Sequence, residues 1–176
     1  MKNSIALIGF MGTGKTAAGK LLAQRLGKEF VELDSLIEKK AGKSIPEIFR
    51  EIGEIGFREL EIDVTRDASA KNNAVIACGG GLVLNRINID RLRTGCLIVC
   101  LTASPSVILK RTSGDHDGRP LLAVADRLAK IKELLRFRRP FYERAADITI
   151  NTSKLSLNGV VEKILTAIKE YENNNQ

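Results

Sequence analysis

The chain has 176 residues, of which 44% are hydrophobic and 28% are charged, and this length and composition fit a single globular domain with a substantial core. No apolar run approaches the roughly 20 residues of a bilayer span, so we expect a cytoplasmic protein with no membrane segment or signal peptide. The formal net charge of +7 suits nucleic acid or anionic small molecules, and the absence of interleaved basic and aromatic residues favours small molecules over nucleic acid.

The first element is a predicted buried strand at residues 4–8, which leads into the segment 9–16, Gly-Phe-Met-Gly-Thr-Gly-Lys-Thr. Apolar residues at helical spacing then predict a helix over residues 15–26. A strand, a glycine loop and Lys-Thr at a helix start form the phosphate-binding pattern G-x-x-x-x-G-K-[ST]. Lys15 can reach the outer phosphates, and the Thr16 hydroxyl can ligate Mg²⁺. We therefore predict that ATP or GTP is bound by Gly12, Thr13, Gly14, Lys15, Thr16 and Ala17.

Residues 30–33 predict a second strand that ends at Asp34. At that strand end Asp34 can take the proton of a substrate hydroxyl, but Asp34 can equally cap the helix that starts at Ser35, and the residues alone leave both readings open. Glu32 lies two residues earlier and would point to the same strand face as Asp34. It can hold a Mg²⁺-bound water, although an exposed strand carboxylate is the commoner case.

Three helices are predicted next, over residues 35–41, from Ser44 through Phe49, and over about 54–70. The first of them closes at Gly42. Ser44 and Glu47 have the spacing of a capping box, which predicts the start of the second. A further strand at residues 74–78 then runs into Gly79, Gly80 and Gly81, where the chain needs close backbone approach or positive φ.

The rest of the chain alternates helices and strands. We predict a short helix at 86–93, a strand at 96–101, a helix from Ser104-Pro105, a mobile loop at 112–120, a helix that is kinked at Pro140, a strand at 147–151 and a helix at 157–171. The alternation predicts an α/β fold with a mostly parallel sheet and helices on both faces. Ligands bind at the carboxyl ends of such strands, so the glycine loop, Asp34 and the glycine triplet should line one rim. Cys78, Cys96 and Cys100 lie in apolar runs without Cys-x-x-Cys spacing, which predicts core residues rather than a disulfide or zinc site.

Four arginines are candidates for binding the substrates. Arg58 has Glu61 one helical turn later, which can orient its guanidinium, and Arg138 falls on the apolar face of its helix, where an arginine needs a partner. Two arginines at one rim suit a carboxylate, which a guanidinium binds with two hydrogen bonds. Arg119 lies in the predicted loop and can close over ATP, and Arg111 at the entrance of that loop can stack on adenine. For Arg58 alone, a solvated helix charge remains the more common alternative.

With these residues in place, the chain resembles the shikimate kinases from residue 5 to about residue 168. The matching stretches are the glycine loop, Leu33-Asp34, Phe57-Arg58-x-x-Glu61, the glycine triplet, and Arg119-Pro120-Leu121-Leu122 followed by Arg138-x-Pro140-x-Tyr142. The resemblance implies a P-loop kinase fold, a five-stranded parallel sheet in the order 2-3-1-4-5, in a single monomeric domain over residues 1–176. It also implies a core of residues 1–111 and 124–176, substrate-binding helices at about 34–61 and a lid at about 112–123.

The same resemblance implies the reaction, which is phosphorylation of the 3-hydroxyl of shikimate by ATP and Mg²⁺ in aromatic amino-acid biosynthesis. It assigns Asp34 as the base, and it places Arg58, Arg138, Gly79, Gly80 and Gly81 around shikimate. It further implies that Arg119 is the lid arginine and that Arg111 lies beside adenine. Lys15 and Arg119 would join Asp34 as catalytic residues.

One departure is that the family usually has Asp-x-Asp where this chain has Glu32-Leu33-Asp34. The loop at about 152–155, on the adenine side, also matches only loosely. Two alternatives stay open. A related kinase, such as a gluconate kinase, also has an acceptor with a carboxylate, and a nucleotide-dependent regulator or RNA-binding protein would use the basic charge.

Overall fold

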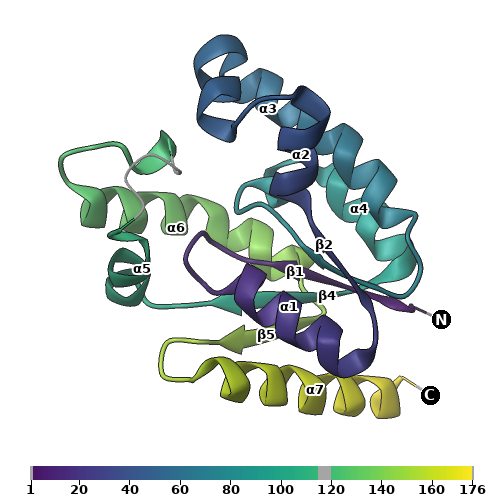
Figure 1. The fold of residues 1–176 in the computed structure, drawn as a ribbon. Helices are drawn as coiled ribbons and strands as arrows, with labels where there is room; N and C mark the ends of the chain where they lie inside the picture. Colours follow the sequence, from purple (N-terminus) through teal and green to yellow (C-terminus); the bar gives the residue numbers. More distant parts are fainter. Residues whose placement is uncertain (1, 115–119, 176) are drawn as a thin grey trace.

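The computed structural model describes residues 2–114 and 120–175, and these residues form an α/β fold around one parallel sheet (Figure 1). The strand order is β2-β3-β1-β4-β5, which confirms the expected topology. The strands are β1 (Ser4–Ile8), β2 (Glu29–Glu32), β3 (Ala74–Ala77), β4 (Cys96–Thr102) and β5 (Ile148–Asn151). Because β1 pairs with both β3 and β4, the loop that follows β1 leaves the sheet at its centre.

Helices cover both faces of the sheet, as Figure 1 shows. One layer contains α1 (Lys15–Leu26) and α7 (Leu157–Asn174), and the other contains α2 (Leu33–Ala41), α3 (Ile45–Ser69), α4 (Arg86–Gly95), α5 (Pro105–Thr112) and α6 (Arg127–Ala145). Two short 3₁₀ helices, η1 (Leu82–Leu84) and η2 (Pro120–Leu122), complete the described elements.

Alternate side chains of the central strand β1 pack into two separate hydrophobic clusters. Ile5 and Leu7 pack toward α1 and α7, whereas Ala6 and Ile8 pack toward the opposite layer. A strand that is covered on both faces needs apolar residues at every position, which explains the uninterrupted run that predicted it.

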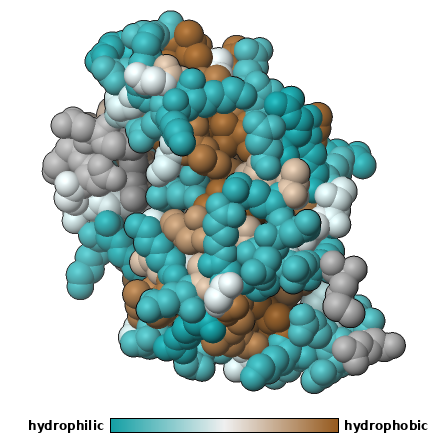
Figure 2. Space-filling model, turned by 45° about the vertical axis from the view of Figure 1, so that its right-hand side comes forward, coloured by the Kyte–Doolittle hydropathy of each residue, from teal (hydrophilic) through white to brown (hydrophobic). Residues whose placement is uncertain are grey.

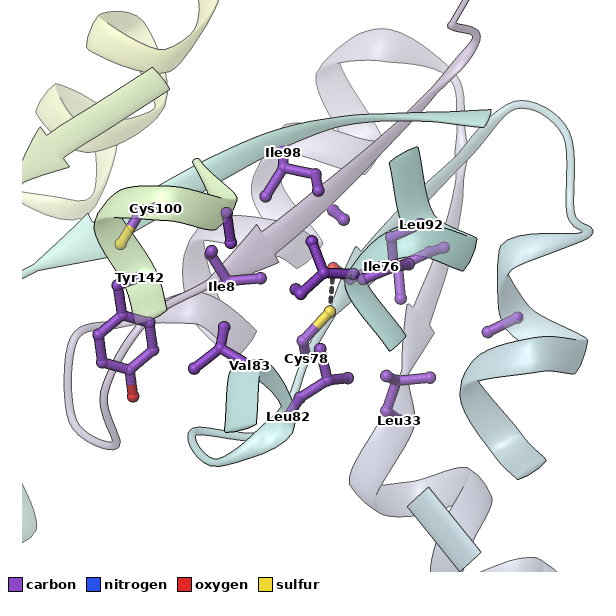
Figure 3. Close-up of a cluster of buried hydrophobic side chains, with 14 of the residues drawn as sticks. Ile8, Leu33, Ile76, Cys78, Leu82, Val83, Leu92, Ile98, Cys100 and Tyr142 are labelled. Carbon is purple, nitrogen blue, oxygen red and sulfur yellow. Dashed lines mark hydrogen bonds between the residues drawn. The ribbon is translucent and has the colours of Figure 1, made fainter. Parts of the chain in front are cut away.

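The cysteines belong to this core, as predicted, and all three are buried free thiols. Figure 3 shows Cys78 among the packed side chains of the cluster, where its thiol donates to the carbonyl of Ile76 at 3.9 Å. Burial raises the pKa of the Cys96 thiol to about 11 and that of the Cys100 thiol to about 12. Thiols with such pKa values stay protonated at neutral pH and are poor nucleophiles.

One predicted boundary is wrong. Strand β2 ends at Glu32, and α2 begins at Leu33, so Asp34 lies in the first turn of a helix instead of at a strand end. The physical reason is that Leu33 and Ile37 are fully buried and Leu36 also packs against the core, which are the three- and four-residue spacings of one helix face. A strand would place Ser35 on the same face as Leu33 and Ile37, but Ser35 is exposed. The two helices predicted at residues 44–49 and 54–70 lie end to end in α3 and are separated at Gly53, whose φ of 68° and ψ of −174° are not helical, so the predicted break between them is confirmed. The predicted capping box of Ser44 and Glu47 is present at its start.

The surface is mixed in character. On the face shown in Figure 2, apolar surface lies in patches that hydrophilic side chains border. Within residues 2–114 and 120–175, no helix has both the length and the apolar character that crossing a bilayer requires.

Candidate active site

The carboxyl ends of β1, β2 and β3 open into one cavity of about 490 Å³. Most of the residues predicted from the sequence to form the site line it together, namely Gly12, Gly14, Lys15, Thr16, Ala17, Asp34, Arg58, Gly79, Gly80, Gly81, Arg111, Arg138 and Glu32. Thr13 is buried beneath the loop, where its hydroxyl donates to the Phe10 carbonyl at 2.8 Å. The predicted lid residue Arg119 lies outside the described residues.

The glycine loop has a backbone that only glycine accepts at its critical points. Gly9 has φ 140°, and a Cβ there would lie 2.1 Å from the carbonyl oxygen of Leu101 on β4. Gly14 has φ 95° and serves as the N-cap of α1 without a side-chain hydrogen bond, and the first turn of α1 has no acidic residue. The amides at the start of α1 therefore remain available for an anion, which the positive end of the helix also attracts.

Lys15 and Thr16 occupy the first turn of α1 and already have defined contacts. The Lys15 ammonium donates to the carbonyls of Gly9 at 2.8 Å and Phe10 at 2.9 Å, so the side chain folds back along the loop. The Thr16 hydroxyl donates to Glu32 Oε1 at 2.5 Å, and Glu32 Oε2 accepts from the Ser35 hydroxyl at 3.2 Å. Because Asp34 is helical, the expected shared strand face of Glu32 and Asp34 is wrong, and Glu32 instead pairs with the loop threonine.

Arg58 and Glu61 form a partly buried ion pair on α3. Arg58 Nη1 donates to Glu61 Oε2 at 2.9 Å, and Arg58 Nη2 donates to Glu54 Oε1 at 3.1 Å. Glu61 is 0% exposed, so its carboxylate depends on this guanidinium for compensation. The predicted orienting role of Glu61 agrees with this geometry.

The glycine triplet brings the backbone close to these charged groups. A Cβ on Gly79 would lie 2.8 Å from Glu61 Oε1 and 3.2 Å from an Asp34 carboxylate oxygen, and one on Gly81 would lie 2.2 Å from Arg58 Nη2. None of the three glycines has positive φ. Of the two reasons expected for the triplet, close approach is therefore the one that applies.

Arg138 reaches the cavity from α6 and is only 2% exposed. Its guanidinium lies 5.6 Å from the centre of the Phe10 ring, and its Nε has no hydrogen-bond partner among the described residues. One turn later, the Tyr142 hydroxyl donates to the Gly80 carbonyl and so ties α6 to the glycine triplet. A buried guanidinium that faces a cavity is suited to bind an anion there.

Burial raises the pKa of the Asp34 carboxyl above its usual range, although the nearby Lys15 ammonium opposes this. Burial also raises the pKa of Glu61, against the opposing effect of Arg58. A carboxylate whose pKa is shifted toward neutral accepts a proton more readily than an ordinary aspartate. Asp34 therefore has the properties of a general base beside the phosphate loop.

Comparison with known proteins assigns the family. A family model described as shikimate kinase matches residues 11–169. The chain belongs to the shikimate kinase family. A shikimate kinase of Thermodesulfovibrio yellowstonii is 49% identical over 98% of this chain and 96% of its own length. A shikimate kinase of Caldanaerobacter subterraneus is 50% identical over 95% of this chain and 96% of its own length. The structure of a shikimate kinase from Acinetobacter baumannii in complex with shikimate is similar with a TM-score of 0.92 and 38% identity, and the match covers 96% of this chain and 93% of that one.

The sequence did not indicate the role of Thr152 in this member of the shikimate kinase family. Its hydroxyl donates to the Thr13 carbonyl at 3.0 Å and to the Thr102 carbonyl at 3.1 Å. The same oxygen accepts from Arg111 Nη1 at 2.9 Å, and the Thr152 carbonyl accepts from Arg111 Nη2 at 3.0 Å. Thr152 thus joins the end of β5, the glycine loop and Arg111. Its place directly after a predicted strand was the signal that could have found it.

Aromatic side chains also line the cavity of this shikimate kinase family member. The rings of Phe49 and Phe57 lie 4.7 Å apart, and the Arg58 guanidinium lies 5.1 Å from the Phe57 ring. Phe49 was not singled out from the sequence, because an apolar residue on an amphipathic helix indicates a core position equally well.

Proposed function

We propose that this chain transfers the γ-phosphoryl group of ATP to the 3-hydroxyl of shikimate, giving shikimate 3-phosphate and ADP in aromatic amino-acid biosynthesis. The observation that carries the proposal is that a phosphate-binding loop, a carboxylate with a raised pKa and two arginines line the same cavity. Each group suits a different part of the two substrates. Family membership and the similarity to a shikimate-bound structure support the same acceptor.

On the donor side, the amides of the loop and of the first turn of α1 hold the phosphates of ATP. Lys15 exchanges its carbonyl partners for a phosphate oxygen and offsets charge as the phosphoryl group moves. Bound Mg²⁺ supplies further neutralisation of the phosphates. The paired oxygens of Thr16 and Glu32 fit this ion, because Mg²⁺ prefers oxygen ligands and takes few of them from the protein.

On the acceptor side, Arg58 and Arg138 bind the shikimate carboxylate, and the backbone of the glycine triplet approaches the ring. The 3-hydroxyl oxygen then attacks the γ-phosphorus, its proton passes to the Asp34 carboxylate, and ADP leaves with the electrons of the broken P–O bond. Burial raises the pKa of Asp34, which makes this proton transfer more favourable.

The remaining parts of the proposal concern the lid and the whole chain. Arg119 stabilises the transferring group when residues of about 112–123 close, and Arg111 stacks on adenine from the position in which Thr152 holds it. The chain acts as one monomeric, cytoplasmic kinase domain over residues 1–176.

A coupled assay of ADP release tests the proposal with shikimate, gluconate, nucleoside monophosphates and RNA as candidate acceptors. We expect turnover with shikimate and with none of the other three acceptors. Turnover with gluconate would assign the chain to the related kinases, and ATP hydrolysis that responds to RNA would support the regulatory alternative. Binding gives a second measure, since shikimate should raise the melting temperature, and more so with ADP and Mg²⁺ present.

A further inference from the structure

A second cavity of about 560 Å³ lies on the other side of η1, between α4 and the C-terminal half of α6. Its wall is largely apolar and contains Val83, Leu84, Ile89, Phe141 and Ala145. Three of these side chains are buried, and Leu84 and Phe141 are half-buried. The size and the apolar wall are those of a small-molecule site.

The rim of this second cavity is basic. Arg86, Arg93 and Arg144 line it, and Asp90 is the one acidic residue among the described residues of the lining. Arg86 lies 3.4 Å from Asp90, which compensates one positive charge. Among the residues that the structure describes, Arg93 and Arg144 have no carboxylate within salt-bridge distance, so two positive charges remain at the rim.

Arg93 and Arg144 are also held in place. Arg93 Nη2 donates to the backbone carbonyl of Arg144 at 2.5 Å, which connects the last turns of α4 and α6 across the cavity. Arg144 Nε donates to the Pro140 carbonyl at 3.2 Å, and its guanidinium lies 5.0 Å from the Phe141 ring. A guanidinium over an aromatic ring can bind a carboxylate at its edge while the ring contacts an apolar body.

We propose that the second cavity binds an aromatic carboxylate, with its ring against Val83, Ile89 and Phe141 and its carboxylate between Arg93 and Arg144. The arginines alone would suit any anion, and the apolar wall alone would suit a neutral ligand. Their combination selects a ligand that has both parts. The site is separate from the proposed kinase reaction, because none of its lining residues belongs to the first cavity.

The probe for this site is naphthalene-2-carboxylate, and its matched control is the neutral naphthalene-2-carboxamide. Binding is followed through the methyl NMR signals of Val83 and Ile89 and by calorimetric titration. We expect saturable shifts of both signals with the carboxylate and at least about ten-fold weaker binding of the carboxamide, because a charge-assisted pair is lost.

Variants locate the bound probe. Arg93→Gln and Arg144→Gln should each weaken binding about ten-fold or more, whereas Arg139→Gln should not change it, because that exposed side chain pairs with Glu143 away from the cavity. Arg58→Ala, which removes a side chain that lines the first cavity and not the second, should also leave binding unchanged. Methyl spectra of each variant without probe show that the fold is retained.

Three results would overturn the proposal. They are the absence of saturable shifts at Val83 and Ile89, equal binding of the carboxamide, and binding that Arg58→Ala removes while Arg144→Gln preserves it. The last would place the probe in the first cavity and leave Arg93 and Arg144 with only their role at the C-terminal ends of two helices.

Discussion

Gly81→Ala should impair the acceptor half of the site by displacing Arg58. The backbone of Gly81, with φ −99° and ψ 0°, is open to alanine, so the substitution brings no backbone strain. The added Cβ, however, would lie 2.2 Å from Arg58 Nη2, 2.5 Å from its Cζ and 2.7 Å from its Nη1. The change therefore acts on a guanidinium at the far end of a flexible side chain.

The size of the effect follows from the required displacement. Ordinary contact begins at 3.4 Å, so the guanidinium must retreat by about 1.2 Å. Hydrogen bonds between charged partners contribute about 1.5–3 kcal/mol, and a shift of about 1 Å in a positioning group can lower the reaction rate by up to about 100-fold. We expect the KM for shikimate to rise about 10- to 100-fold, while the KM for ATP stays near that of the wild type.

Steady-state kinetics with each substrate varied in turn measure this effect. Gly95→Ala is the matched control, because its Cβ would meet only Ser69 O at 3.5 Å, outside the cavity. Arg58→Ala alone should raise the KM for shikimate, and adding Gly81→Ala to it should have no further effect, since both changes remove the same contact. An unchanged KM in Gly81→Ala, or effects of the two changes that add fully, would refute the reasoning.

Three other changes test the remaining parts of the site. Asp34→Asn should lower kcat at least about 100-fold and raise the melting temperature at neutral pH. The sign follows because burial raises the pKa of Asp34, so the stability of the wild type falls as pH rises from the ordinary value of 3.8 toward the raised pKa, whereas asparagine stays neutral. The increase in melting temperature of Asp34→Asn should therefore shrink toward acid pH, and an increase that grew there would contradict this reasoning. Thr152→Val should raise the KM for ATP about 5- to 30-fold, with Thr152→Ser restoring it, because the hydroxyl holds Arg111 and the glycine loop; an unchanged KM would leave Thr152 without that role. Gly9→Ala should lower the free energy of unfolding in urea by about 3 kcal/mol or more, since its Cβ would meet the Leu101 carbonyl, and a wild-type midpoint would show that the loop can relax.

Much of this protein could be predicted because its signals are local. The strand at 4–8, the helix at 15–26 and the capping box at Ser44 depend on hydrogen bonds and spacing within a few residues, and the structure has all three. The rule that ligands bind at the carboxyl ends of parallel strands then placed the glycine loop and the glycine triplet at one cavity. The family resemblance predicted the strand order, and the structure confirms that order.

The sequence by itself thus determined the alternation of elements, the phosphate loop and the residue types of an acceptor site. Only the tertiary structure decided that Leu33 packs into the core and so places Asp34 in the first turn of α2, that Gly81 lies against the Arg58 guanidinium and that Thr152 joins Arg111 to the glycine loop. The physical reason is that these contacts join segments far apart in the chain. Their distances depend on how helices and strands pack, which no periodicity within one segment encodes.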